Sequence, residues 1–337
     1  MMRKEEFNSF YTMEPMKYYQ PSSYDLPKAK SMLANENNRY IATWKSDGEW
    51  CRIIWDGENS ICAQSRSISK VTGEYGNKTA HIPHILEEIK RLPDGLVLLG
   101  ELCYQDVTRT SKDVGSILRC LPERAVMRQK LPENKLVFKV FDCLYYGTSL
   151  MDAPYYERFL AAIYSVKELN AQYVMMCDYR TSDFEDYLQS ILAVGGEGIV
   201  IHDKNYLYAP GKRTAWTTMK VKKITQELEL PVVATILPNR DYNGTELDSW
   251  EYWEGSDPVT KPYYYGWRNG VVVNHNGTLV RVTSGLTDAD REWLASGDAM
   301  SAVEEGKLFA VVSAMEVDKV SGSLRHPRLV RLRDEVI

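Results

Sequence analysis

The chain has 337 residues, which at about 150 residues per domain predicts two domains. Hydrophobic residues make up 44% and charged residues 26%, which is typical of a soluble globular protein and excludes a disordered or fibrous chain. No segment reaches the roughly 18 apolar residues of a membrane helix, and the N-terminus lacks the apolar core of a secretory signal. The net charge of −5 excludes a uniformly basic nucleic-acid coat, so any DNA contact requires local basic patches.

The cysteine and histidine patterns do not predict a metal site. None of the six cysteines forms a CxxC pair, which argues against zinc or a disulfide framework and favours a reducing compartment, the cytoplasm. His81 and His84 form an H-x-x-H pattern without an evident third ligand, so we interpret them as ordinary loop residues.

The first two-thirds of the chain mixes strands and helices. The Asp56-Gly57 hairpin signal predicts two strands within residues 50–66. Dense β-branched, aromatic and other apolar residues predict three more strands, at 96–104, 135–146 and 198–203.

A helix is predicted over residues 182–194. Ser182 and Glu185 form a capping-box pattern, and Gly195-Gly196 can end the helix. Between them runs an apolar stripe at helical spacing, made of Phe184, Tyr187, Leu188, Ile191 and Leu192.

The character of the chain changes near residue 224, after which it is mostly β. Asn276-Gly277 lies between two alternating apolar runs and predicts a hairpin. One short helix is expected at about 288–296, after Thr287 and before Gly297. A β-rich segment of this length with one helix suits a small OB-type barrel. The sequence therefore predicts an α+β protein with domains at 1–226 and 227–337.

Lys45 is the first candidate for chemistry, because Lys-Ser-Asp-Gly at 45–48 lies in a turn between two predicted strands. Taken alone, a surface turn lysine is the more common explanation. Three acids, Glu101, Asp142 and Glu197, also interrupt apolar strands, where a carboxylate is costly without a partner. Each could be a buried salt bridge or a capping carboxylate. Lys220 and Lys222 alternate on a strand and share one face, so together these residues predict one polar pocket within a β core.

Five segments in this order resemble the nucleotidyltransferase motifs of ATP-dependent DNA ligases: KSDGEW (45–50), LLGELCY (98–104), KVFDCL (139–144), GGEGIVI (195–201) and TMKVKK (218–223). Two later segments, SGLTDADREWL (284–294) and SGSLRHPRLVRLRDE (321–335), resemble the OB domain and the C-terminal end of those ligases. The chain is most similar to the short two-domain ligases of bacteriophages. The resemblance implies a nucleotidyltransferase (adenylation) domain followed by an OB-fold DNA-binding domain.

The resemblance also implies a three-step reaction that uses ATP. Lys45 would attack the α-phosphorus and form lysyl-AMP, AMP would pass to the 5′-phosphate of a nick, and the 3′-hydroxyl would then release AMP. A lysine at its usual pKa of about 10.4 is a poor nucleophile at neutral pH. The cations of Lys220 and Lys222 would disfavour its protonated form and contact the α-phosphate.

Further roles follow from the same resemblance. Glu197 and Glu101 would be ligands of Mg²⁺, with Glu101 also near the ribose. Phe141 would stack on adenine, and Asp47 would work near the metal and the reacting hydroxyl. Arg66 would contact nucleotide or nick phosphate.

The implied partner is nicked double-stranded DNA, bound by a monomer. Arg66 and a C-terminal cluster would contact its phosphates without sequence preference; the cluster comprises Arg325, Arg328, Arg331 and Arg333. The aromatic run at 250–267 could stack on bases, although packing in the barrel or a surface loop is favoured.

Two departures from the family leave alternatives open. Trp50 stands where these ligases have an arginine. Arg52 lies two residues further on and faces the same side of the predicted strand, so we hypothesise that it partly takes over the missing DNA contact, with Trp50 packing against sugar or base. The alternative is that Arg52 is an exposed strand residue and Trp50 fills the barrel side of the hairpin. The C-terminal motif ends in Glu335-Val336 instead of Asp-Lys. Three other functions stay open: a nick- or end-binding protein with weak or no turnover, an RNA ligase, and a capping-type nucleotidyltransferase.

Overall fold

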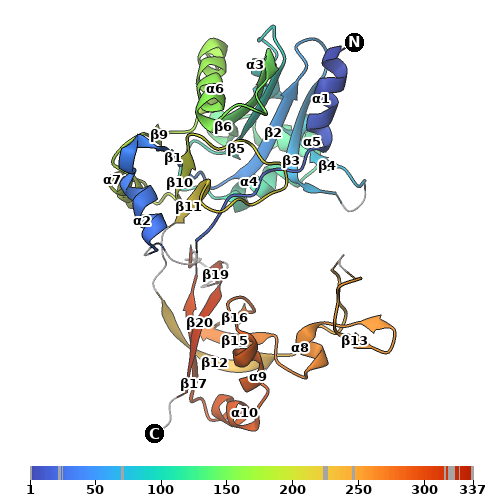
Figure 1. Ribbon diagram of the computed structural model, residues 1–337, viewed down its shortest axis with the longest axis vertical. Coiled ribbons are helices and arrows are strands. Elements are labelled where there is room, and N and C mark those ends of the chain that lie inside the picture. Colours follow the sequence, from blue (N-terminus) through green and yellow to red (C-terminus); the bar gives the residue numbers. More distant parts are fainter. Residues whose placement is uncertain are drawn as a thin grey trace. The chain divides into compact units, whose positions relative to one another are not determined.

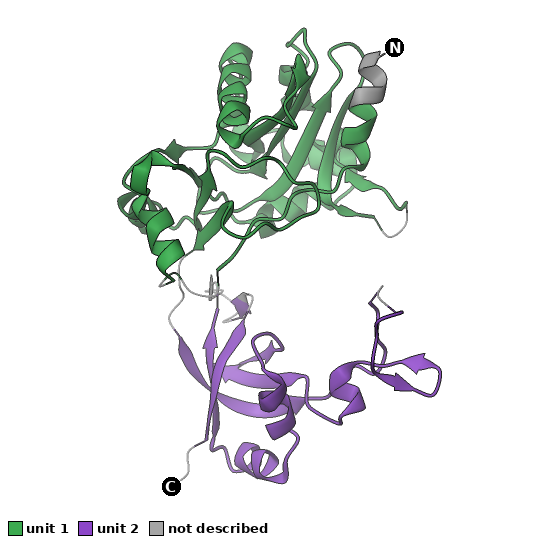
Figure 2. Cartoon of the chain, in the orientation of Figure 1, with its two compact units in different colours: residues 1–222 green, residues 223–337 purple. Residues whose placement is uncertain are grey.

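The computed structural model describes residues 2–21, 24, 26–69, 72–222, 227–244, 247–314, 316–317, 323–325 and 327–334. The chain divides into two compact units, residues 1–222 and 223–337 (Figure 2). Each unit has its own hydrophobic core. Both units combine helices with largely antiparallel sheets, in agreement with the predicted α+β class (Figure 1).

The larger sheet of unit 1 has the strand order β4-β3-β2-β5-β6-β7, and β8 pairs with β6 in parallel. The bounds are β2 (Glu49–Trp55), β3 (Ile61–Ile68), β4 (Tyr75–Asn77), β5 (Leu96–Cys103), β6 (Val137–Tyr146), β7 (Thr148–Ser149) and β8 (Val174–Met176). The predicted hairpin is confirmed, because β2 and β3 pair antiparallel around Asp56 and Gly57. The Asp56 carboxylate accepts three backbone N–H groups of the loop, and Gly57 adopts φ +84°.

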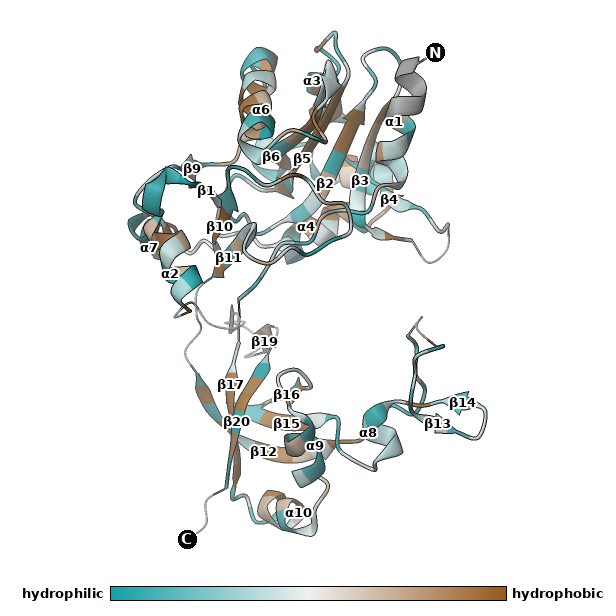
Figure 3. Cartoon of the chain, in the orientation of Figure 1, coloured by the Kyte–Doolittle hydropathy of each residue, from teal (hydrophilic) through white to brown (hydrophobic). Residues whose placement is uncertain are grey.

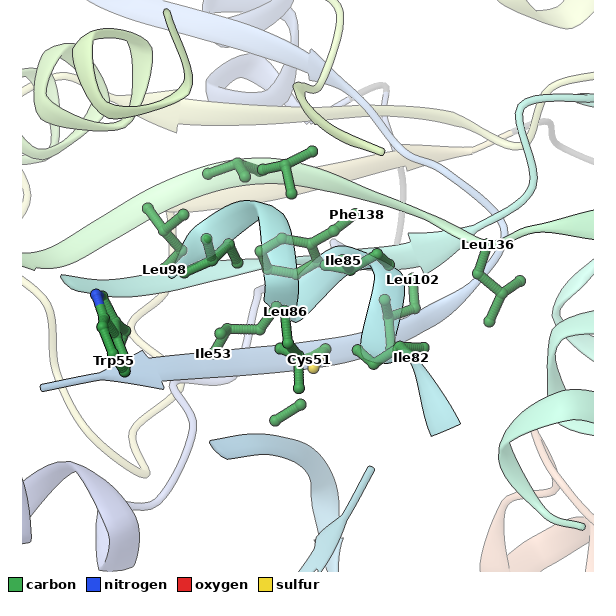
Figure 4. Packing of buried hydrophobic residues seen from close by; sticks show 14 of the residues in the cluster. Cys51, Ile53, Trp55, Ile82, Ile85, Leu86, Leu98, Leu102, Leu136 and Phe138 are labelled. Carbon is green, nitrogen blue, oxygen red and sulfur yellow. The ribbon is translucent and has the colours of Figure 1, made fainter. Parts of the chain in front are cut away.

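Helices cover both faces of this sheet. On one face, Ile85 and Leu86 of α3 pack against Ile53, Leu98 and Phe138 (Figure 4). Helices α4 and α6 contribute to the same cluster, and α1 contributes to the cluster on the other face. The helical segments in this part of unit 1 are α1 (Met2–Thr12), η2 (Thr79–His81), α3 (Pro83–Ile89), α4 (Ser111–Leu118), α5 (Pro122–Arg128), η3 (Pro132–Asn134) and α6 (Tyr155–Leu169).

A second, four-stranded sheet completes unit 1. Its order is β11-β10-β1-β9, with β1 (Tyr40–Trp44), β9 (Tyr179–Arg180), β10 (Gly198–Asp203) and β11 (Thr218–Lys222) all antiparallel. Helices α2 (Pro27–Ala34) and α7 (Phe184–Ala193) pack against it, and η1 (Glu36–Asn38) precedes β1.

Helix α7 confirms the predicted helix but not its cap. The predicted capping box at Ser182 and Glu185 is wrong, because the N-cap residue is Asp183 in a left-handed conformation. The Ser182 hydroxyl donates instead to the Asp183 carboxylate. The helix ends before Gly195, which has φ +84°.

Unit 2 contains a five-stranded antiparallel sheet of order β16-β15-β12-β17-β20. An isolated parallel bridge joins Ser284, just after β16, to Arg328 at the start of β20, so the two edge strands approach each other. The bounds are β12 (Leu228–Ile236), β15 (Gly270–His275), β16 (Thr278–Val282), β17 (Leu308–Ser313) and β20 (Arg328–Asp334). The predicted hairpin at Asn276 and Gly277 is confirmed, with φ of 52° and 88°.

The remaining elements of unit 2 lie between these strands. They are β13 (Trp253–Glu254), β14 (Asp257–Pro258), α8 (Lys261–Tyr264), α9 (Asp288–Trp293), α10 (Gly297–Glu304), β18 (Glu316–Val317) and β19 (Leu324–Arg325). Thr287 caps α9 as expected. The prediction of a single helix is wrong, because the Ser296 hydroxyl accepts the Ala299 N–H and starts α10. Several strands, among them β2, β5 and β17, are rich in hydrophobic residues (Figure 3). No described helix is long and apolar enough to cross a membrane.

Candidate active site

Lys45 lies in the turn that leaves the small sheet and enters the large one. Its backbone N–H donates to the Gly198 carbonyl at 2.9 Å, which fixes the turn to the start of β10. Gly48 is required at the other end of the turn, since a Cβ there would lie 2.2 Å from the Leu102 carbonyl oxygen. The same Cβ would lie 2.9 Å from the Glu101 side chain. The turn therefore packs directly against β5, the strand that carries Glu101.

The Lys45 ammonium is held by a carboxylate. Lys45 Nζ forms an ion pair with one oxygen of Glu197, and Lys222 Nζ lies 3.1 Å from the other oxygen. The side chains of Lys45, Glu197 and Lys222 are 19%, 13% and 23% exposed. The three groups thus form a partly buried cluster that a ligand can still reach.

Lys220 lies on β11 two residues before Lys222, so both side chains leave the same face of the strand. Burial lowers the pKa of Lys220 to about 8, and the cations of Lys45, Lys222 and Arg66 contribute in the same direction. An anionic ligand at this point would relieve that repulsion. The cluster is therefore suited to a phosphate.

Glu101 faces the same site from the large sheet. It lies opposite Trp50 on β2 and Lys139 on β6. Burial raises the pKa of Glu101 to about 8, with Lys45 opposing the shift and the carboxylates of Glu197 and Asp47 adding to it. The pKa of the Glu101 carboxyl therefore lies much closer to neutral pH than that of an exposed glutamate.

Phe141 and Arg66 lie in the same unit, on different strands. Phe141 on β6 is half-buried, and its ring centroid is 6.2 Å from that of Tyr18. Arg66 on β3 is exposed and donates to the Met16 carbonyl at 3.0 Å. Their roles toward adenine and phosphate remain predictions.

Asp142 is not part of this cluster. Its carboxylate and the Arg158 guanidinium are both fully buried and form a bidentate ion pair at 2.9 and 3.1 Å. The expectation that all three strand acids enter one pocket is therefore wrong for Asp142. It is a buried salt bridge between β6 and α6.

Arg52 is also placed differently from the expectation. Its side chain is fully buried and donates twice to the Gln64 side-chain oxygen, at 2.8 and 3.2 Å, and once to the Met13 carbonyl at 2.8 Å. The guanidinium lies 5.9 Å from the Trp50 ring, so the two residues share one side of β2 as predicted. The buried side chain contradicts both the expected DNA contact and the alternative of an exposed strand residue.

Three of the four C-terminal arginines lie on β20 in unit 2, and Arg325 lies on β19. Arg328 is exposed, Arg331 lies 3.9 Å from Glu227, and Arg333 pairs with Glu229 at 2.8 Å. The side chain of Arg325, and the departures at 335 and 336, lie outside the described residues.

The other candidates have structural explanations. All six cysteines are free. His81 and His84 each donate from Nε2 to a backbone carbonyl, at 2.9 Å. Within the described ranges, no group of three or more His, Cys, Asp or Glu side chains is placed to hold a metal ion.

Sequence reasoning missed two neighbours of the site. The N-terminal segment runs beside β11, where the Tyr19 carbonyl accepts the Lys220 N–H at 2.9 Å and the Tyr24 hydroxyl donates to the Lys220 carbonyl at 3.0 Å. Lys139 is the cross-strand partner of Glu101. The N-terminal segment carries no motif, whereas the strand alternation around 137–146 could have placed Lys139 beside an acid.

Three lysines gathered around one carboxylate, with a second carboxyl nearby, define a site for a polyanionic substrate and for lysine-based nucleophilic chemistry. Residues 23–222 match the family model described as the ATP dependent DNA ligase domain. The chain belongs to this family.

Curated relatives and solved structures agree with this assignment. The DNA ligase of Methanococcus aeolicus is 26% identical over 297 residues, which is 82% of this chain and 48% of the relative. The DNA ligase of Archaeoglobus fulgidus is 28% identical over 323 residues, 87% of this chain and 51% of the relative. The chain thus spans about half the length of these relatives.

Two solved structures share the fold at 19% identity. One, described as Pmar-Lig_PreS3, has a TM-score of 0.63 and covers 98% of this chain and 70% of its own. The other comes from a structure-function analysis of Lig E DNA ligases; it has a TM-score of 0.58 and covers 95% of this chain and 98% of its own.

Proposed function

We propose that this chain seals nicks in duplex DNA with ATP, through a lysyl-AMP intermediate on Lys45. The observation that carries the proposal is the ion-paired cluster of Lys45, Glu197 and Lys222, beside Lys220 and Glu101. Family membership supports ATP as the nucleotide.

In the first step, the Lys45 amine attacks the α-phosphorus of ATP. A P–N bond forms as the P–O bond to pyrophosphate breaks. The ion pair positions the Lys45 nitrogen and provides, in Glu197, a carboxylate that can accept its proton. Lys220 and Lys222 extend from β11 toward the same carboxylate and neutralise charge on the α-phosphate.

In the second and third steps, the same cations act on DNA. The P–N bond breaks as AMP passes to the 5′-phosphate at the nick, which regenerates the Lys45 amine. The 3′-hydroxyl then attacks the activated 5′-phosphate, a phosphodiester bond forms, and AMP leaves. Asp47, two residues after Lys45, is the candidate for orienting the hydroxyl.

The residues present fit Mg²⁺ bound mainly through substrate. Magnesium in phosphoryl-transfer sites commonly takes one or two carboxylates and completes its shell with phosphates and water. Glu197 and Glu101 would supply those carboxylates, which is consistent with the lack of a larger acidic group among the described residues. When bound, the ion would neutralise charge on the transferring phosphate.

For unit 2 we propose an OB-fold that binds DNA. The order β16-β15-β12-β17-β20, together with the parallel bridge from Ser284 to Arg328, supports a small five-stranded, partly open barrel. Arg328, Arg331 and Arg333 on β20 supply phosphate contacts, and the domain boundary falls near residues 222–227.

Incubation with α-³²P-labelled ATP and Mg²⁺, then with nicked DNA, tests the proposal. We expect a covalent protein label that chases into DNA as the nick closes. Label from GTP alone would support a capping-type enzyme, and sealing of nicked RNA alone would support an RNA ligase. No label, with nicked DNA still bound, would support a binding protein of the same fold.

A further inference from the structure

We propose that helices α4 and α5 of unit 1 form a second DNA-contact surface, beside the Lys45 turn and separate from the arginines of β20. Residues 111–130 contain five basic and two acidic residues, a net charge of +3 in a chain whose total is −5. The inference rests on the proposed function, because it assigns this surface to the nicked duplex.

The surface is built around an open groove on α5. The groove is lined by Leu121, Glu123, Arg124, Met127 and Arg128. Ala125 of α5 and Gln129, which follows the helix, are buried and fix this segment to the body of unit 1. All five lining residues are exposed.

The cations of the groove are available to a ligand. Arg124, Arg128 and Lys130 are exposed, and none forms an ion pair with any described residue. Arg128 donates one N–H to the Ser116 carbonyl at 2.5 Å, which orients its guanidinium and leaves its other donors for a ligand. Oriented guanidinium groups bind phosphate through paired hydrogen bonds.

Exposed apolar side chains lie between these charges. Leu121 is 69% exposed and Met127 is 63% exposed, although α4 and α5 are otherwise packed against the sheet. A DNA backbone alternates charged phosphates with apolar sugar faces. A groove that alternates guanidinium groups with Leu and Met therefore complements a duplex better than a purely ionic surface does.

The position of the surface links it to the reaction. Arg119, at the end of α4, pairs with Glu49 at 2.8 Å. Glu49 is the first residue of β2 and directly follows the turn that carries Lys45. A duplex held on α4 and α5 is thereby held near the turn of the reactive lysine, within the same compact unit of the chain.

The test is equilibrium binding of the full chain to a nicked duplex that ends in a 3′-dideoxynucleotide, which cannot be sealed. Arg124→Gln/Arg128→Gln is compared with Lys90→Gln/Lys167→Gln, which removes two exposed cations, one just after α3 and one in α6. Anisotropy is measured from about 50 to 200 mM salt, a range over which phosphate contacts dominate affinity. Lysine adenylation, which does not involve DNA, is measured in parallel.

We expect the Arg124/Arg128 variant to bind about 10- to 100-fold more weakly near 100 mM salt, with a log–log salt slope shallower by about 1.8, or 0.9 for each lost phosphate contact. The control variant should match the parent. If the Arg124/Arg128 variant binds DNA with the affinity and salt slope of the parent, helices α4 and α5 are not a DNA-contact surface. The basic surface would then fit an acidic protein as its partner. Failure of the parent to form lysyl-AMP would instead refute the proposed function.

Discussion

Replacing Arg52 with alanine should destabilise unit 1 without removing a DNA contact. The side chain is fully buried and makes three hydrogen bonds, to Gln64 and to the Met13 carbonyl. Its loss leaves two buried acceptors unsatisfied, each costing about 1–3 kcal/mol, and adds a cavity that raises the total to about 3–5 kcal/mol. For a unit of this size, that lowers the melting temperature by roughly 6–20 °C.

The assay is thermal unfolding of Arg52→Ala beside Arg91→Ala, an exposed arginine of the same unit, followed by nicked-DNA binding well below both transitions. Arg91→Ala should change stability by less than about 0.5 kcal/mol. We expect Arg52→Ala to bind DNA with an affinity close to that of the parent while it is still folded. A stable Arg52→Ala protein whose affinity falls tenfold or more would refute this reasoning and restore Arg52 as a DNA contact.

Two further predictions concern buried ionisable groups. Because the pKa of Glu101 is raised to about 8, the folded state holds a proton that the unfolded state releases above about pH 4.5. The free energy of unfolding should therefore fall as pH rises from 4.5 to 8. In urea titrations at pH 5 and 8, Glu101→Gln should reduce this fall by about 2–4 kcal/mol. The same pH dependence in parent and variant would contradict a raised pKa at Glu101. Asp142→Ala leaves Arg158 buried without its partner and should cost about 3–5 kcal/mol by urea unfolding, whereas Asp142→Ala/Arg158→Met should recover most of the loss. A cost below 1 kcal/mol for the single variant would show that the ion pair is not closed in solution.

The sequence predicted most of the residues and strands that form the candidate site. Lys45 directly follows β1, Glu197 directly precedes β10, and Lys220 and Lys222 lie on β11, so three neighbouring strands of the four-stranded sheet join all four residues. β1 and β10 are apolar runs, β11 is recognised by its alternating lysines, and the hairpins at Asp56 and Asn276 are set by turn chemistry. Local signals of this kind need no knowledge of the tertiary structure.

The errors came from residues whose role depends on distant partners. Arg52 turns inward because Gln64, on the neighbouring strand, accepts two of its hydrogen bonds. Asp142 is neutralised by Arg158 from α6, which lies in no motif. In both cases the residue type is compatible with a functional site. Only the packing of a second element against the side chain gives it a structural role instead.

The most direct test of the account is the identity of the adenylated residue. The parent protein, incubated with α-labelled ATP and Mg²⁺, should retain a covalent label that maps to Lys45 by peptide mass spectrometry. Lys45→Ala should carry no label and seal no nick, and Lys204→Ala, a lysine of the same unit placed after β10, should be labelled normally. Undiminished labelling of Lys45→Ala, or an adduct mapped to another lysine, would contradict the account.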